Sequence, residues 1–286
     1  AIKAADTIDA DGDGEAARVG MTWATQGLVP ADAANPADVA AADLAYYFQH
    51  RLFMNAVRAG DLDADFDGAA DENHPEWANR IDWAGVQYYS AAAVVPSTLP
   101  PPFTALRCSD NLAAALGDLW LRLLDQAGCP PAPNLDFPLP GYEGTVGRHF
   151  GDVHLPEGIV GLLEEFATQY PDLPLFVTEN GFGFRDGEQA GGDRVRAKSL
   201  VRHLAAIHDA IDQGIDVRGY FHWTLMDNWE WNSGNGFRIG LLDVDYATYD
   251  RAPNEAYRVY GEIAGARFLP DALYAEYGEG PLRDAE

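Results

Sequence analysis

The chain has 286 residues, 47% of them hydrophobic and 12% aromatic, a composition typical of a globular protein with a sizeable core. Its 45 acidic residues outnumber its 19 basic residues and give a formal net charge of -26 at pH 7, and its lysines are Lys3 and Lys198. A surface of this sign disfavours nucleic acid and anionic membranes as partners, and the sequence has no apolar run long enough to span a bilayer.

The N-terminal region combines an alanine-rich start, Ala1–Ile8, with the first of two acidic runs. Both runs, Asp9–Gly14 and Asp63–Gly68, carry alternate Asp residues and a Gly at the sixth place, as calcium loops do. Neither has the Glu expected at the twelfth place, where Gly20 and His74 stand. Each run is therefore interpreted either as a calcium loop or as a solvated acidic turn, with the candidate ligands Asp9, Asp11, Asp13, Asp63, Asp65 and Asp67.

Four apolar segments predict buried parallel strands, each followed by a segment with a helical pattern. They are Arg18–Thr25, Ile81–Ser90, Pro174–Glu179 and Val217–Leu225. A whole barrel of eight strands and eight helices takes roughly 250 residues, so the length alone would suit a complete barrel. The four predicted strands, however, indicate half of such a barrel. We therefore predict an α/β fold, a partial (β/α)8 TIM barrel that forms a single domain over residues 1–286.

A proline-rich segment at about residues 91–150 separates the second and third predicted strands. In a barrel, such a strand-to-helix insertion lies over the catalytic face. The segment contains a helical stretch, Asn111–Ala127, flanked by Cys108 and Cys129. These cysteines are interpreted either as a disulfide, which implies an oxidising compartment, or as two unpaired thiols.

The last two predicted strands bring sugar-binding residue types to the same end of the sheet. Leu175–Gly181 is a short apolar run that ends in a Gly-rich turn and delivers Glu179 at its carboxyl end. Val217–Leu225 leads into a loop with Trp229, Glu230 and Trp231. Indole faces suit the apolar faces of sugar rings, and carboxylates suit their hydroxyls. The pattern indicates half of a sugar-cleaving site.

These motifs resemble the C-terminal part of glycoside hydrolase family 1, the β-glucosidase and β-galactosidase family. The resemblance rests on Thr-Glu-Asn-Gly at 178–181 and on Trp-Thr-Leu-Met-Asp-Asn-Trp-Glu-Trp at 223–231. It extends to Gly-Val-Gln-Tyr-Tyr at 85–89 and to the spacing of Gly234, Arg238, Gly240 and Arg251. It implies that the four strands correspond to strands five to eight of the family's barrel.

The resemblance also implies roles for individual side chains. Glu179 is expected to be the nucleophile of a retaining β-glycosidase and to form a covalent glycosyl intermediate, with Tyr89 holding its orientation. Trp223 is expected to form the floor beneath the sugar, and Glu230 and Trp231 to bind its outer hydroxyls. Asn180 and Gln87 complete the expected substrate-binding set. Because Glu230 would repel a phosphate, unphosphorylated β-glucosides or β-galactosides are the expected substrates.

The family's acid/base motif, Asn-Glu-Pro, does not occur in the sequence, and Asp71–Pro75 is interpreted as a polar loop. Two hypotheses follow. The chain is either part of a glycosidase whose N-terminal half-barrel supplies the acid/base, or a self-standing half-barrel that binds carbohydrate or a partner without catalysis. The expected partners are a β-glycoside or oligosaccharide and either the missing N-terminal half or a second copy in a homodimer.

Several smaller features bear on the site. Gln87, Asn235, Ile239 and Asp152 depart from the family pattern, and Asp152 stands where a Trp commonly floors the leaving-group site. No spacing of the seven histidines indicates a metal site or any other cofactor site. His203 and His208 are predicted to face solvent on a helix, and His222 to face either the barrel interior or the helices.

Overall fold

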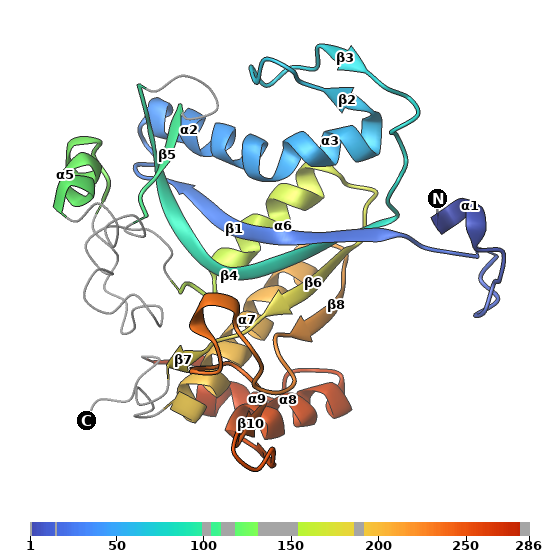
Figure 1. The fold of residues 1–286 in the computed structure, drawn as a ribbon, viewed down its shortest axis with the longest axis vertical. Helices are drawn as coiled ribbons and strands as arrows, with labels where there is room; N and C mark the ends of the chain where they lie inside the picture. The colour runs from blue at the N-terminus through green and yellow to red at the C-terminus, as the bar shows by residue number, and fades with distance from the viewer. Residues whose placement is uncertain are drawn as a thin grey trace.

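The computed structural model describes residues 2–14, 16–98, 104–109, 118–130, 154–185 and 192–280. Its centre is a parallel sheet in the order β1-β4-β6-β8, with helices following each strand along the chain (Figure 1). The main strands are β1 (Gly20–Pro30), β4 (Trp83–Pro96), β6 (Leu175–Asn180) and β8 (Val217–His222). Short antiparallel pairs are made by β2 (Asp61–Leu62), β3 (Glu72–Asn73), β5 (Ala105–Arg107), β7 (Phe184–Arg185), β9 (Phe237–Arg238), β10 (Leu242–Val244) and β11 (Arg251–Pro253).

Helices lie between successive parallel strands, as a parallel sheet requires, and others precede β1 or follow β8. They are α1 (Ile2–Ala5), α2 (Pro36–Tyr46), the π-helical turn η1 (Tyr47–Arg51), α3 (Leu52–Ala59), α5 (Asp118–Gln126), α6 (Gly158–Gln169), α7 (Gly192–Asp212), the 3₁₀ turn η3 (Trp231–Ser233), α8 (Glu255–Ala266), α9 (Asp271–Leu273) and the π-helical turn η4 (Tyr274–Gly278). None of these described helices has the length and apolarity needed to cross a bilayer.

The sheet is open at both ends. Within the described residues, β1 is paired along one edge by β4, and β8 is paired along one edge by β6. A closed barrel has no such free edges. The four strand-helix units therefore form a partial (β/α)8 barrel, as the strand count predicted.

Two strands extend further than the sequence indicated. β1 continues to Pro30 and β4 to Pro96, because they stay in register from Gly27 opposite Ala91 to Pro30 opposite Val94. The added part of β4 begins with the fully buried alanine run Ala91–Ala93 and continues through Val94 and Val95 to an exposed Pro96. Alanine has low strand propensity, so pairing with β1, and not local preference, carries the strand through this run.

The helical segment α2-η1-α3 has clear start and stop signals. Asn35 caps it by accepting a hydrogen bond from the backbone N–H of Ala37, and Pro36 occupies the first turn. Gly60 ends it in the left-handed conformation at φ 83°. Beyond Gly60, the segment interpreted as the loop Asp71–Pro75 contributes the exposed strand β3, which pairs with the half-buried strand β2.

The core lies between the sheet and the helices. Ala84, Val86 and Tyr88 alternate along β4 and are all fully buried in one cluster, together with Leu162 and Phe166 of α6. Because side chains alternate across a strand, Gly85, Gln87 and Tyr89 point to the opposite, inner face. The inner face is where the site lies.

The insertion after β4 is anchored by a disulfide between Cys108 and Cys129, with a Cα–Cα distance of 5.5 Å. Of the two interpretations of these cysteines, the structure has the disulfide. It joins the end of β5 to the segment after α5, and Leu124 of α5 packs against it in a small buried cluster. The first half of the predicted helix at 111–127 lies outside the described residues.

Candidate active site

A pocket of about 460 Å³ opens beside the carboxyl ends of the parallel strands. It contains six of the seven side chains predicted for the site: Gln87, Tyr89, Glu179, Trp223, Glu230 and Trp231. The rest of its lining is apolar or glycine: Ala24, Gly181, Phe182, Gly183, Phe237 and Ile239. A few carboxylates and amides in an otherwise apolar cleft are the usual make-up of a small-molecule site.

Glu179 reaches the inner face through an irregularity in β6. Val86 of β4 pairs with Val177 of β6, but the next residue, Gln87, pairs with Glu179, so Thr178 is passed over. Val177 packs in the core on the helix side, and strict alternation would turn Glu179 to that side as well. The extra residue re-aims it into the pocket, as bulges beside active sites commonly do.

Two donors from β4 hold the Glu179 carboxylate. The Gln87 amide donates from Nε2 to Oε1 at 2.7 Å, and the Tyr89 hydroxyl donates to Oε2 at 2.8 Å. Burial, and next the negative charge of Glu179, raise the pKa of Tyr89 far above its ordinary value. Tyr89 therefore stays protonated and can act as a hydrogen-bond donor at neutral pH.

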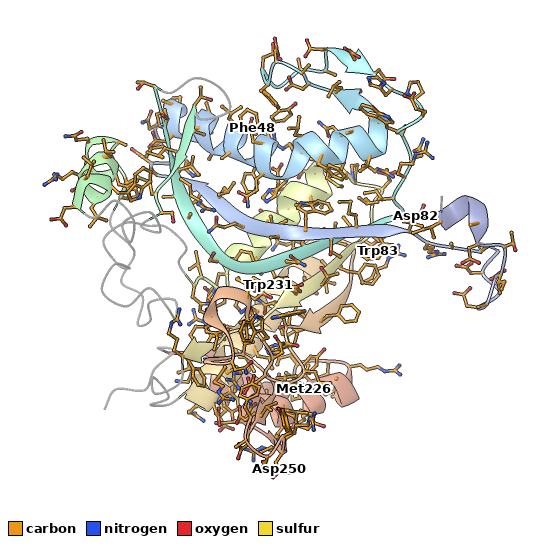
Figure 2. The ribbon with its side chains drawn as sticks, viewed as in Figure 1. Phe48, Asp82, Trp83, Met226, Trp231 and Asp250 are labelled. Atoms are coloured by element: carbon orange, nitrogen blue, oxygen red, sulfur yellow. A yellow bond between two sulfur atoms is a disulfide. The ribbon has the colours of Figure 1, made fainter. Side chains whose placement is uncertain are left out.

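The segment after β8 supplies a second carboxylate and two indoles. The Trp223 indole N–H donates to Glu230 at 3.3 Å. Trp231 begins the turn η3 with φ 40° and is 83% exposed, and Figure 2 labels it near the carboxyl end of β6. Trp229 is also exposed but does not line the pocket.

Gly181 permits the close approach of the segments that follow β6 and β8. The backbone N–H of Trp223 donates to the carbonyl of Asn180 at 2.9 Å. A Cβ on Gly181 would overlap the carbonyl oxygen of Trp223. Only glycine fits at this position, which explains the Gly that follows the Glu-Asn pair.

Asn180 is placed differently from the other predicted site residues. It is fully buried, its amide donates to the carbonyl of Tyr88 at 2.7 Å, and its oxygen accepts from the hydroxyl of Tyr220 at 2.8 Å. Its side chain therefore ties β6 to β4 and β8 on the helix side of the sheet, and it is not among the residues that line the pocket.

Arg196 is a residue that the sequence analysis missed. It lies on α7 with a fully buried guanidinium that donates to the carbonyls of Phe182, Gly240 and Arg238 at 3.3, 2.7 and 3.3 Å. It thus joins the loop after Glu179 to the segment that carries Ile239 into the pocket. The available signal was an arginine within the apolar run Val195, Ala197, Leu200 and Val201 of a predicted helix.

The three histidines whose orientation was predicted differ in burial. His203 was predicted to face solvent, but it is fully buried and its Nδ1 lies 2.8 Å from the carbonyl of Ser199. The prediction was wrong because α6 and α8 both cover α7, so two faces of that helix are buried. His208 is exposed, as predicted. His222 faces the helices, with its ring 6.1 Å from that of Tyr260 on α8.

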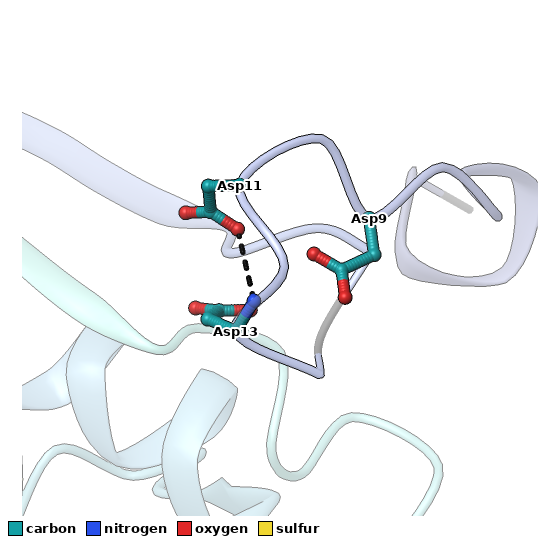
Figure 3. Close-up of side chains that lie close together, drawn as sticks. All are labelled: Asp9, Asp11 and Asp13. Carbon is teal, nitrogen blue, oxygen red and sulfur yellow. Dashed lines mark hydrogen bonds between the residues drawn. The ribbon is translucent and has the colours of Figure 1, made fainter.

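The acidic run before β1 brings three carboxylates together. Oxygens of Asp9, Asp11 and Asp13 lie within 4.8 Å of one another on an exposed loop (Figure 3). Asp9 also accepts hydrogen bonds from the backbone N–H groups of Gly12 and Gly14. Calcium binding by this loop stays a prediction.

The second acidic run differs in one member. The carboxylates that converge are Asp63, Asp65 and Asp71, and Asp67 is not part of the group. Asp63 is buried and accepts hydrogen bonds from the Tyr47 hydroxyl and from backbone N–H groups of its own loop. Calcium binding here also stays a prediction. The departure noted at Asp152 lies outside the described residues.

Comparisons with known proteins agree with this geometry. Residues 2–267 match the model of glycosyl hydrolase family 1. The chain is 31% identical over 258 residues to a β-galactosidase of Sulfolobus acidocaldarius, covering 89% of this chain and 44% of that protein. It is 32% identical over 199 residues to a bifunctional β-D-glucosidase/β-D-fucosidase of Bifidobacterium breve, covering 67% of this chain and 37% of that protein.

Solved structures show the same relation. A β-glycosidase from Pyrococcus horikoshii superimposes with a TM-score of 0.68 at 29% identity, covering 93% of this chain and 52% of that one. The chain therefore spans about half the length of the relatives it matches.

Proposed function

Because this chain belongs to glycosyl hydrolase family 1, we propose that it carries the nucleophile half of a retaining β-glycosidase site. The observation that supports the proposal most directly is the Glu179 carboxylate, held by Gln87 and Tyr89 inside the pocket. A carboxylate fixed by two donors beside an apolar floor suits attack on an anomeric carbon.

The proposed reaction has two steps. In the first, a Glu179 oxygen forms a bond to the anomeric carbon while the bond from that carbon to the leaving oxygen breaks. In the second, water attacks the same carbon and releases Glu179 and the sugar with its original configuration. A retaining enzyme also needs a second carboxyl group about 5 Å from the nucleophile, which gives a proton to the leaving oxygen and later takes one from water.

Glu230 does not suit that second role. It lies in the pocket and accepts a hydrogen bond from Trp223, and we assign it with Trp223 and Trp231 to binding of the sugar. We therefore propose that another polypeptide segment, equivalent to the half of the relatives that this chain does not cover, supplies the acid/base. Here, the complete protein means this chain together with that segment. Its proposed substrates are unphosphorylated β-glucosides or β-galactosides, since the Glu230 carboxylate would repel a sugar phosphate.

The isolated chain is expected to show no measurable hydrolysis of cellobiose or lactose. Both have poor leaving groups that need protonation, and general acid catalysis typically contributes about 10²–10⁴-fold. Released glucose, measured with a coupled assay over hours, tests this. The control is a dinitrophenyl glucoside, whose leaving group departs without a proton. Rapid cleavage of either disaccharide by the purified chain would contradict the assignment of the acid/base to another segment.

The isolated chain is also expected not to persist as a stable monomer. The free edges of β1 and β8 offer unpaired backbone groups, and open edges pair readily with other chains. Association with the missing half, with a second copy, or in larger aggregates would each cover them. Sedimentation at several salt concentrations should detect these species, and self-association should increase with salt because it screens the repulsion between chains of net charge -26.

A cooperatively folding monomer at micromolar concentration would contradict this expectation. A stable complex that binds sugar without turning it over, even when an acid/base segment is present, would favour the alternative of a carbohydrate-binding half-barrel.

A further inference from the structure

Gln87 occupies a defined place beside the proposed nucleophile. It lies on β4 directly opposite Glu179 on one side and Ala24 of β1 on the other. Its backbone carbonyl accepts a hydrogen bond from the Thr25 hydroxyl at 2.7 Å, which ties this point of β4 to β1. Pairing with β1 and with β6 therefore fixes the backbone position from which the Gln87 side chain extends.

The amide group at the end of the Gln87 side chain contacts Glu179. Its amide nitrogen lies 2.7 Å from Oε1, while Tyr89, two residues further along the same face, binds Oε2 at 2.8 Å. Each carboxylate oxygen is therefore held by a different donor from the same strand. Since each oxygen has two lone pairs, both keep an acceptor position for the pocket side.

The length of the side chain matters for this contact. Asparagine has the same amide on a stem one methylene shorter, and from the same backbone position it would stop more than 1 Å short, on the order of one carbon-carbon bond. Ala24, the neighbour on the other side, has no polar side-chain atom to draw the amide away. The geometry therefore favours the nucleophile as the partner of the Gln87 Nε2 donor.

We propose that Gln87 is a positioning residue, which together with Tyr89 fixes the Glu179 carboxylate in the orientation needed for attack. The inference rests on the proposed function of Glu179 and reassigns Gln87 from the sugar-binding set to the nucleophile. With Tyr89 alone, the carboxylate keeps one anchor and can rotate about its last bond. A misplacement of about 1 Å at a reacting group can cost roughly 100-fold in rate.

The test separates rate from binding. The complete protein and its variants Gln87→Leu and Gln87→Asn are treated with a deoxyfluoro β-glucoside of dinitrophenol, which can trap a covalent sugar on the nucleophile without an acid catalyst. The intact mass and the labelled peptide are followed over a full range of reagent concentrations. We expect labelling at Glu179, a rate constant at saturation about 10- to 100-fold lower in both variants, and an unchanged half-saturating concentration.

A matched control is Gln26→Leu. Gln26 is a buried glutamine on β1 that does not line the pocket; its amide donates to Ser90 at 3.0 Å and accepts from Arg107 at 2.8 Å. This change should therefore alter the labelling rate by less than about threefold. Near-ultraviolet circular dichroism of all variants verifies the fold, and Gln87→Asn keeps the test usable if Gln87→Leu does not fold.

The outcomes are distinguishable. Labelling of the wild type with unchanged kinetics in both Gln87 variants would overturn the inference and leave the proposed function standing. A higher half-saturating concentration with an unchanged rate would overturn it as well, because that result assigns Gln87 to the sugar. Labelling of a residue other than Glu179, or none at all, would refute the proposed function and this inference together.

Discussion

Replacing Glu179 with glycine in the complete protein is expected to lower the hydrolysis of β-glucosides by roughly 10⁴-fold or more. Among the described residues that line the pocket, the other carboxylate is Glu230, which is engaged with Trp223. No second group there is placed to form the covalent intermediate. The measurement is kcat/KM on an aryl β-glucoside, with and without added azide or formate.

Added azide or formate tests whether the lost activity is that of the nucleophile. Glycine leaves a space where the carboxylate was, so azide or formate can attack an activated glycoside in its place and give a product of inverted configuration. Glu279→Gly, at an exposed position far along the chain, is the matched control and should keep full activity. Near-normal hydrolysis by the Glu179 variant would refute its role as nucleophile.

Mild acid is expected to destabilise the folded chain strongly, through its buried histidines. Burial lowers the pKa of His50 to about 4, of His203 to about 4 and of His222 to about 3, and it holds the pKa of His154 well below the ordinary value of 6.5. In the unfolded chain these groups take up protons below about pH 6.5. Folding stability is therefore intact above that pH and falls as the pH drops toward the folded-state values.

The size of this effect follows from the number of groups. Each histidine that stays neutral in the folded state costs about 1.4 kcal/mol per pH unit below its unfolded pKa. Four such groups would remove on the order of 5 kcal/mol between pH 6.5 and 5.5, comparable with the whole stability of many proteins. Urea unfolding followed by circular dichroism at pH 7.5 and 5.5, at one ionic strength, measures it.

Two variants make the pH test specific. His203→Leu should reduce the dependence by about one proton, because it removes a buried group that titrates only after unfolding. His208→Gln should leave the dependence unchanged, because His208 is exposed on the same helix. Equal free energies of unfolding at the two pH values would show that these histidines do not control acid stability.

Local patterns, together with the family resemblance that they carry, predicted most of the residues that line the candidate pocket. A short apolar run that ends in Glu179-Asn180-Gly181, and a strand that leads into Trp223, each indicate a strand and its carboxyl end without knowledge of the rest. Parallel strands place their carboxyl ends at one edge of the sheet, so the strand order alone implies that these segments meet. The half-barrel followed from the same patterns, by counting strand-helix units.

The tertiary structure decided where individual side chains point, because direction depends on the register between strands and on what covers each face. The bulge that turns Glu179 inward exists only in the pairing of β6 with β4. The same pairing brings the Gln87 amide to Glu179 and buries Asn180 on the helix side. The burial of His203 likewise depends on helices far away in sequence. Side chains along a strand alternate between its two faces, so a shift of one residue in the pairing turns them to the opposite face. No local signal in this sequence indicates where such a shift occurs.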